Sequence, residues 1–379
     1  KNFETASIKA NYKSETDYLN LQATFPNLIY GANTIKNVSL QADTDSNKLV
    51  YNLGIEKLQS DKYQINQINL SGDVIDDKIQ YLFQILDSDK KQQYQISGEL
   101  AALETGTRIS LDPNGLMLNY DTWTVTADNS IDILTQSQGI KAKNFILENN
   151  GSQLAINSIN EAANAPIDVE FKNFEIESLT HIIKKDSLLA RGKINGKAQL
   201  RDITTDLKFV GDLLISDLEV MNSKVGNLDV KVTNTRREDT YNALIILTEN
   251  GNDVRVFGGY NPKIDALRLQ ANIKSLQLLT LQGFANQTIS NPSGYLSGDL
   301  KISGGLAAPK INGEVKFNEV GLTVNALNAT FKNINQPILF TDEGIRFNQF
   351  QIADSENNKL SLNGRILTSN YSDFKFNLR

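Results

Sequence analysis

Apolar and polar side chains alternate along most of this chain, and this period of two constrains its fold more than any other feature. The alternation is clear at residues 19–25, 49–55, 81–85, 116–127, 267–273 and 374–378. Successive side chains of a strand point to opposite faces of a sheet, so the pattern predicts strands with one apolar and one solvated face. Long apolar runs typical of parallel sheets are missing, which favours antiparallel meanders.

Three glycines recur at a spacing of 102 residues, with matching apolar positions around them. The pairs are Gly192 with Gly294, Gly196 with Gly298, and Gly211 with Gly313. A hairpin pattern recurs as well, at residues 147–156, 247–256 and 352–364, and an Asn-Gly pair marks the turn in the first two. Such repetition is typical of a body built by stacking one supersecondary unit.

Two segments depart from the alternation and have helical spacing, with a serine near the start that can cap a helix. They are residues 177–185 and 275–285, and a weaker third segment covers 158–165. One unit is then a short helix followed by six or seven strands. We expect an N-terminal β-repeat portion at 1–172 and two repeat units at 173–274 and 275–379.

Composition removes several classes of function. The chain of 379 residues has no cysteine and one histidine, His181, so we expect no catalytic residues, no metal site and no cofactor. A helical surface or half-buried position is the simplest interpretation of His181. The net charge of −6 argues against a nucleic-acid partner. We therefore expect a protein that is not an enzyme.

No apolar stretch approaches the ~20 residues of a transmembrane helix. The chain starts at Lys1 and ends on a strand-like pattern at Arg379, so we interpret both ends as cuts through a longer protein. A membrane anchor or targeting signal is then expected outside these residues.

The apolar faces of about thirty strands need a cover that two short helices do not supply. A sandwich of two sheets is the default solution. The alternative is an elongated, curled antiparallel sheet with an open hydrophobic groove. Thirty strands in one ladder span on the order of 140 Å at ~4.8 Å per strand. Alternation alone does not say which face forms the groove, or whether neighbouring strands keep their register.

We expect the groove lining among apolar positions that share a strand face in the two repeat units. They are Ile194, Ala198, Leu200, Leu213, Ile215, Leu296, Leu300, Ile302, Val315, Phe317, Phe347, Ile352, Leu360 and Leu362.

Residues 293–331 and 338–366 resemble the TamB family, in which a Gly-x-Leu-x-Gly strand leads to a proline, a second glycine and a hairpin with an aspartate turn. The corresponding residues are Gly294, Leu296, Gly298, Pro309, Gly313, Asp354 and Gly364. The match covers residues 171–379, and the first 170 residues are similar only in style. The resemblance implies a β-taco protein of the AsmA-like, bridge-like lipid transfer group. It also implies an inner-membrane anchor, a place in the periplasm of a Gram-negative bacterium, and a partner barrel of the TamA type.

Two functions remain open at this point. The first is a periplasm-spanning conduit that carries phospholipids between the inner and outer membranes, with lipid tails on the groove floor. The second is a structural or chaperone-like β scaffold, which serves outer-membrane protein assembly or forms a surface β-solenoid.

Overall fold

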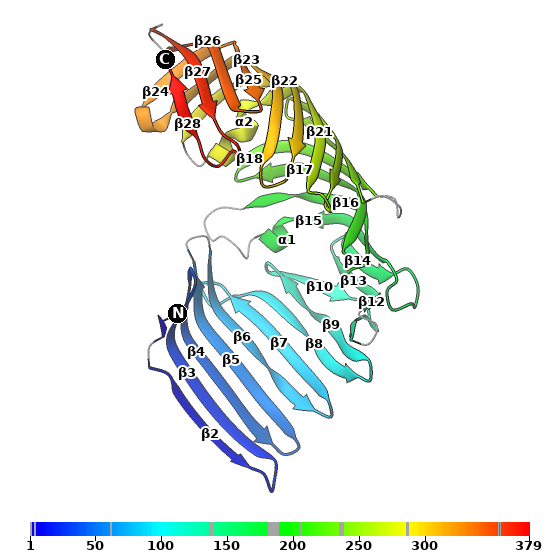
Figure 1. Cartoon of the computed structure of the whole chain (residues 1–379). Helices are drawn as coiled ribbons and strands as arrows, with labels where there is room; N and C mark the ends of the chain where they lie inside the picture. The colour runs from blue at the N-terminus through cyan, green and yellow to red at the C-terminus, as the bar shows by residue number, and fades with distance from the viewer. Residues whose placement is uncertain are drawn as a thin grey trace. The chain divides into compact units, whose positions relative to one another are not determined.

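The computed structural model is almost entirely β-structure (Figure 1). It describes all residues except 1, 4, 61–62, 136–138, 181–188, 205, 235–238, 286–287, 355 and 357. The described strand pairs are all antiparallel, which confirms the predicted all-β class. The chain divides into unit 1 (Lys1–Leu189 and Lys197–Lys208) and unit 2 (Ala190–Gly196 and Phe209–Arg379). The three-part division expected from the repeat stays a prediction.

Unit 1 begins with a long meander, drawn from blue to cyan in Figure 1, in which each strand from β2 to β9 pairs with the next. Its elements are β1 (Asn2–Phe3), β2 (Ser7–Lys13), β3 (Tyr18–Tyr30), β4 (Asn33–Asp45), β5 (Lys48–Gln59), β6 (Gln64–Ile75), β7 (Lys78–Leu86), β8 (Gln92–Leu103), β9 (Gly106–Leu118), β10 (Asp121–Val125), β11 (Ser130–Leu134), β12 (Gly139–Lys143), β13 (Phe145–Asn149), β14 (Ser152–Ser158), β15 (Ile167–Glu175) and α1 (Glu177–Thr180).

The meander of unit 1 branches at β9. The first half of β9 pairs with β11, which pairs with β12, whereas its second half pairs with β10. From β10 the ladder continues through β13 and β14 to β15. The register between β8 and β9 jumps from Leu111 to Leu116, so residues 112–115 form the break at which the two branches separate.

Unit 2 contains a second meander, in which β17 to β23 pair in order. The boundary between the units falls within β16 (Ala190–Arg201). The further elements are β17 (Lys208–Val220), β18 (Ser223–Thr233), β19 (Tyr241–Glu249), β20 (Asn252–Asn261), β21 (Ala266–Gln277), α2 (Leu278–Leu281), the 3-10 helix η1 (Gln282–Ala285), β22 (Ile289–Gly304), β23 (Pro309–Val324), η2 (Asn325–Leu327), β24 (Ala329–Ile334), β25 (Pro337–Thr341), β26 (Gly344–Asp354), β27 (Lys359–Leu367) and β28 (Lys375–Leu378).

The sequence repeat is also a repeat of structure. The order β13-β14-β15-α1-β16-β17 recurs as β19-β20-β21-α2-β22-β23, with η1 added after α2. Each series opens with a hairpin whose Asn-Gly turn has positive φ at both residues: 46° and 85° at Asn150 and Gly151, and 51° and 80° at Asn250 and Gly251. These values are those of the hairpin turn that the Asn-Gly pairs predict.

The helix predictions need two corrections. The segment 275–285 becomes helical only at Leu278, because β21 continues to Gln277; the Ser275 hydroxyl donates to the Gly251 carbonyl at 2.7 Å instead of capping a helix. No helix forms at 158–165. Ser158 ends β14, and the Ile159 N–H donates to the Pro166 carbonyl to close a turn. The first predicted helix is present as α1, and residues 181–185, including His181, lie outside the described residues.

Candidate functional site

Neighbouring strands of unit 2 keep a register that joins their apolar side chains into continuous rows. We call the longest one the central row. It comprises Leu213, Val230, Ile245, Val256, Ala271, Leu300, Gly313, Phe340, Ile345, Ile366 and Phe376, one residue from each of eleven strands. Directly opposed residues of an antiparallel pair point to the same face. The central row therefore crosses the sheet without a polar side chain.

Two further rows flank the central row on the same face. The proximal row comprises Ile215, Leu228, Leu247, Val254, Ile273, Gly298, Val315 and Ile338. The distal row comprises Val232, Ala243, Gly258, Leu269, Ile302 and Ile311. The three rows bring together five of the residues expected to line a groove: Leu213, Ile215, Leu300, Ile302 and Val315.

The rows are only partly covered. Most of their side chains, Leu213, Ile245 and Leu300 among them, are half-buried. Ala271, Ile273 and Val315 are buried, and Phe376 is exposed. The main contacts of β19 and β20 are with their ladder neighbours, and the described part of the chain places no second sheet over them. A half-buried apolar face of this extent can take up apolar material from solution.

The opposite face of the same strands is more polar and carries exposed ion pairs among its side chains. Asp212 and Lys231 form an ion pair at 2.7 Å across β17 and β18, and Asp253 and Lys274 form another at 2.9 Å across β20 and β21. Both pairs are exposed, so they contribute little to stability. The two ion pairs identify this face as the outer, water-facing one.

Glycines on the apolar face stand where neighbouring backbones approach closely. A Cβ added to Gly298 or Gly313 would lie 2.1 Å or 2.0 Å from the carbonyl oxygen of Glu314 or Asp299 on the neighbouring strand. Their φ angles, +146° and +138°, also lie in the region that side chains disfavour. The recurring glycines therefore allow neighbouring backbones to approach closely where the sheet curls.

Five other predicted lining residues pack into a closed cluster. Its buried centre is formed by Leu278, Val320, Ile334 and Phe350, with exposed fractions from 0% to 6%. Packed around it, and only partly buried, are the predicted residues Leu296, Phe317, Phe347, Ile352 and Leu362. These five residues have protein neighbours on the apolar side, and their contact with a ligand stays a prediction.

The remaining predicted residues lie at strand positions with other surroundings. Ile194, Ala198 and Leu200 occupy alternate, half-buried positions of β16. Leu360 of β27 pairs with Ile352 of β26, and its side chain is 51% exposed. The place of these residues in a groove lining stays a prediction.

Unit 1 carries a comparable apolar face that the residue predictions did not include. One row crosses seven strands through Ala23, Leu40, Leu53, Leu70, Phe83, Ile96 and Leu116. A parallel row contains two tyrosine–glycine pairs, Tyr51 with Gly72 and Tyr81 with Gly98. The alternation at residues 49–55 and 81–85 was the available signal.

A buried aromatic group lies beyond the branch point in unit 1. Trp123 is 1% exposed and Phe174 is 2% exposed, and their ring centroids are 5.6 Å apart. Phe171 meets Phe174 edge-on at 5.8 Å. Trp123 is thus a core residue, and the apolar face of unit 1 ends in a closed hydrophobic core on this side.

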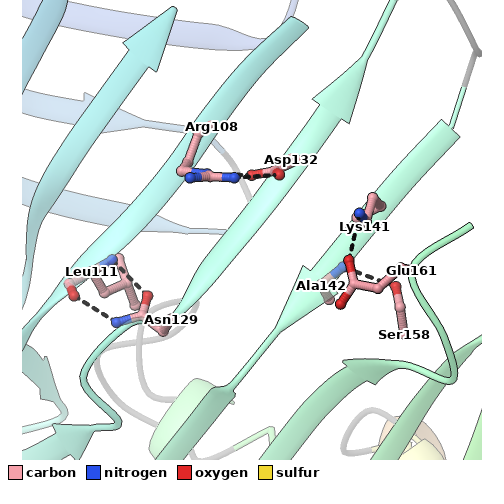
Figure 2. Close-up of polar contacts among 8 residues, drawn as sticks. All are labelled: Arg108, Leu111, Asn129, Asp132, Lys141, Ala142, Ser158 and Glu161. Carbon is pink, nitrogen blue, oxygen red and sulfur yellow. Dashed lines mark hydrogen bonds and ion pairs between the residues drawn. The ribbon is translucent and has the colours of Figure 1, made fainter. Parts of the chain in front are cut away.

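Polar contacts hold the other branch in place (Figure 2). Arg108 makes two hydrogen bonds to the Asp132 carboxylate, at 2.7 and 2.8 Å, and Lys141 pairs with Glu161 at 2.7 Å. The bonds from Arg108 lower the pKa of the Asp132 carboxyl, against the opposing effect of burial. These polar contacts join β9, β11, β12 and the chain after β14.

Asn129 strengthens the same branch (Figure 2). Its amide nitrogen donates to the Leu111 and Thr126 carbonyls, and its amide oxygen accepts from the Leu111 N–H at 2.8 Å. Asn129 is 5% exposed, so these bonds satisfy an otherwise costly buried amide. The cluster in Figure 2 is structural, since each group is used to join strands.

The described residues contain no metal-binding cluster. No three His, Asp or Glu side chains within them gather so as to hold a metal ion. A pocket of about 700 Å³ at β25–β27 has a largely polar lining that includes Asn312, Arg346 and Arg365, and Arg365 pairs with Glu343.

No described helix is long and apolar enough to cross a membrane.

Comparison with known proteins gives one match. The family model described as "TamB, N-terminal domain" matches residues 6–317. No curated protein and no solved structure matches.

Proposed function

The chain belongs to the TamB family, and we propose that its apolar sheet faces carry the acyl chains of phospholipids between the inner and outer membranes. TamB proteins belong to the Gram-negative envelope and act in outer-membrane assembly or lipid transport, without enzymatic activity. The family is associated with a TamA partner. Phospholipid as the cargo of this chain is the proposal.

The observation that supports this function is the central row with its flanking rows. Burying a methylene stabilises by about 0.8 kcal/mol, so exposing two acyl tails of about thirty methylenes to water costs roughly 24 kcal/mol. Lipid crosses an aqueous gap only where an apolar lining replaces the membrane along the path. Rows without polar side chains, on strands with a solvated outer face, provide such a lining.

Location and partners follow from the same proposal. We place the chain in the periplasm, anchored in the inner membrane by a segment outside these residues. The partner is an outer-membrane barrel of the TamA type, contacted through regions outside this sequence. Head groups remain in water at the open side of the groove.

A matched pair of variants tests the proposal. Leu213 belongs to the central row, whereas its neighbour Leu214 points to the outer face and is 42% exposed. Lipid extraction and mass spectrometry of the purified chain should detect bound phospholipid. Leu213→Asn should lower its amount several-fold and Leu214→Asn should leave it unchanged, provided circular dichroism shows both variants folded.

The scaffold function gives a different result in the same experiment. A chain that only supports barrel assembly would purify without phospholipid, and both variants would behave like the parent. Crosslinking to nascent barrel proteins would then replace lipid as the functional readout. Absence of phospholipid from the folded parent chain contradicts the conduit.

A further inference from the structure

The connection between β21 and β22 packs against the apolar face of unit 2, near one end of its strands. We call residues 278–285, which comprise α2 and η1, the crosspiece. The crosspiece contacts β18, β21 and β22. Leu278 also packs in the cluster with Val320 of β23, Ile334 of β24 and Phe350 of β26. A segment of eight residues therefore joins strands that are far apart in the ladder.

A buried asparagine fixes the crosspiece at its start. The Asn252 amide nitrogen donates to the Val225 carbonyl at 2.8 Å and to the Thr280 hydroxyl at 2.9 Å, and its amide oxygen accepts from the Gln277 N–H at 2.8 Å. Asn252 is 5% exposed and Thr280 is 3% exposed. A buried polar network with its partners in place holds one arrangement.

A second contact fixes the other end. The Gly283 N–H donates to the Ser223 hydroxyl at 2.8 Å. A Cβ at Gly283 would lie 2.8 Å from the Val220 carbonyl oxygen, so η1 lies directly against the β17–β18 turn. Both ends of the crosspiece are thus attached to the sheet.

These contacts all lie on one side of the three rows. Ser223 and Val225 precede Leu228 of the proximal row on β18, and Asn252 precedes Val254 of that row on β20. The central and distal rows lie progressively farther along the same strands. The crosspiece therefore stands beside the proximal row and leaves the central and distal rows open.

We propose that the crosspiece is a fixed side wall that divides the apolar face lengthwise and confines acyl chains to the central and distal rows. This assignment rests on the proposed function and deepens it. Leu300, Ile302 and Leu269 then contact ligand. Phe317 and Phe347 support the wall from the closed side.

The crosspiece also has apolar surface of its own. Leu279 and Phe284 of the crosspiece are 56% and 57% exposed, whereas Leu278 of the same segment is buried. Exposed apolar side chains on a short, fixed segment beside an open apolar face extend the surface that a ligand covers. Acyl chains are the fitting occupant, because strands β18 to β22 of the rows already pair with a neighbour on both edges and offer no free edge to a protein strand.

Photocrosslinking can locate the ligand on either side of the wall. Tyr260 follows Gly258 of the distal row by two residues, and Phe317 packs in the closed cluster, so both positions accept an aromatic photoreactive residue with little change in size. The photoreactive residue p-benzoylphenylalanine is placed at one position at a time in the full chain. The chain is loaded with phosphatidylethanolamine–phosphatidylglycerol vesicles, irradiated, and analysed for lipid adducts by mass spectrometry.

The wall predicts adducts at position 260 at least five-fold above those at 317. Asn252→Ala should release the crosspiece and raise the yield at 317, while Asn242→Ala, at an exposed outer-face position of β19, should not. Equal yields at 260 and 317 in the parent chain overturn the side wall but support a conduit. No adduct at any position overturns the proposed function and this assignment with it.

Discussion

The hydroxyl of Tyr51 lies over Gly72, its partner on the next strand, and donates a hydrogen bond to the Gln80 carbonyl one strand further on, at 2.9 Å. A Cβ at Gly72 would lie 1.8 Å from that carbonyl oxygen and 2.8 Å from the tyrosine hydroxyl oxygen. The glycine therefore makes room for a contact that spans three strands. Tyr81, Gly98 and Ser110 repeat the arrangement, with a hydrogen bond of 3.3 Å.

Gly72→Ala should destabilise unit 1 by about 3 kcal/mol, at the upper end of the cost of overpacking, because a backbone carbonyl cannot move aside as a side chain can. Gly54→Ala is the matched control on the adjacent strand. Its Cβ would meet only the Ser39 hydroxyl at 2.9 Å, which rotates easily. We expect a loss within about 1 kcal/mol for the control. Urea unfolding followed by circular dichroism measures both, and equal losses would refute the steric explanation.

Tyr51→Phe should cost about 1 kcal/mol, because it removes one hydrogen bond and retains the ring. Burial raises the pKa of the Tyr51 hydroxyl, so the group stays protonated and donating throughout the neutral range. Tyr12→Phe is the control, since Tyr12 is 61% exposed and its bond to Asp17 is in solvent. Chemical unfolding should give no measurable change for the control; a similar loss in both variants would contradict the role given to the Tyr51 bond.

The Arg108–Asp132 pair should make the stability of the branch depend on pH. Arg108 holds the pKa of the Asp132 carboxyl below its ordinary value of 3.8. The stabilisation is then complete above that value and is lost as the pH falls through the folded-state pKa, because the unfolded chain takes up the proton first. Asp132→Asn should lower stability at pH 7 and make little difference in strong acid.

Thermal unfolding from pH 7 to pH 2 measures this difference. Asp121→Asn changes an exposed carboxylate at the start of β10 and serves as the control. A gap between parent and Asp132→Asn that stays constant over the whole pH range would exclude the ion pair as its cause.

Much of the fold could be predicted from the sequence because its determinants are local. Alternation is visible in residues that are adjacent in the sequence, and a turn such as that at Asn150-Gly151 is specified by two consecutive residues. The 102-residue spacing of the glycines predicted a repeat that the structure confirms in the order of its elements. The predicted start of the second helix was wrong, because Ser275, a good capping residue, donates its hydroxyl to the Gly251 carbonyl within the sheet.

Features that depend on distant contacts were not predictable in this way. The branch at β9 is held by hydrogen bonds between Asn129 and Leu111, which alternation does not report. The predicted lining joined Leu300, on the open face, with Phe317, in the closed cluster, since both alternate correctly on their strands. Only the tertiary position of the crosspiece separates them.

The central claim is that lipid occupies one face of the sheet, and β19 offers the most direct test. Ile245 belongs to the central row, and Ile246, the same residue type on the same strand, points to the outer face between Asp229 and Arg255. A photoreactive residue at each position, irradiated in cells, reports which face meets lipid. Phospholipid adducts at 245 and none at 246 are the expected result. Equal labelling at both positions, or labelling at 246 alone, would contradict the account.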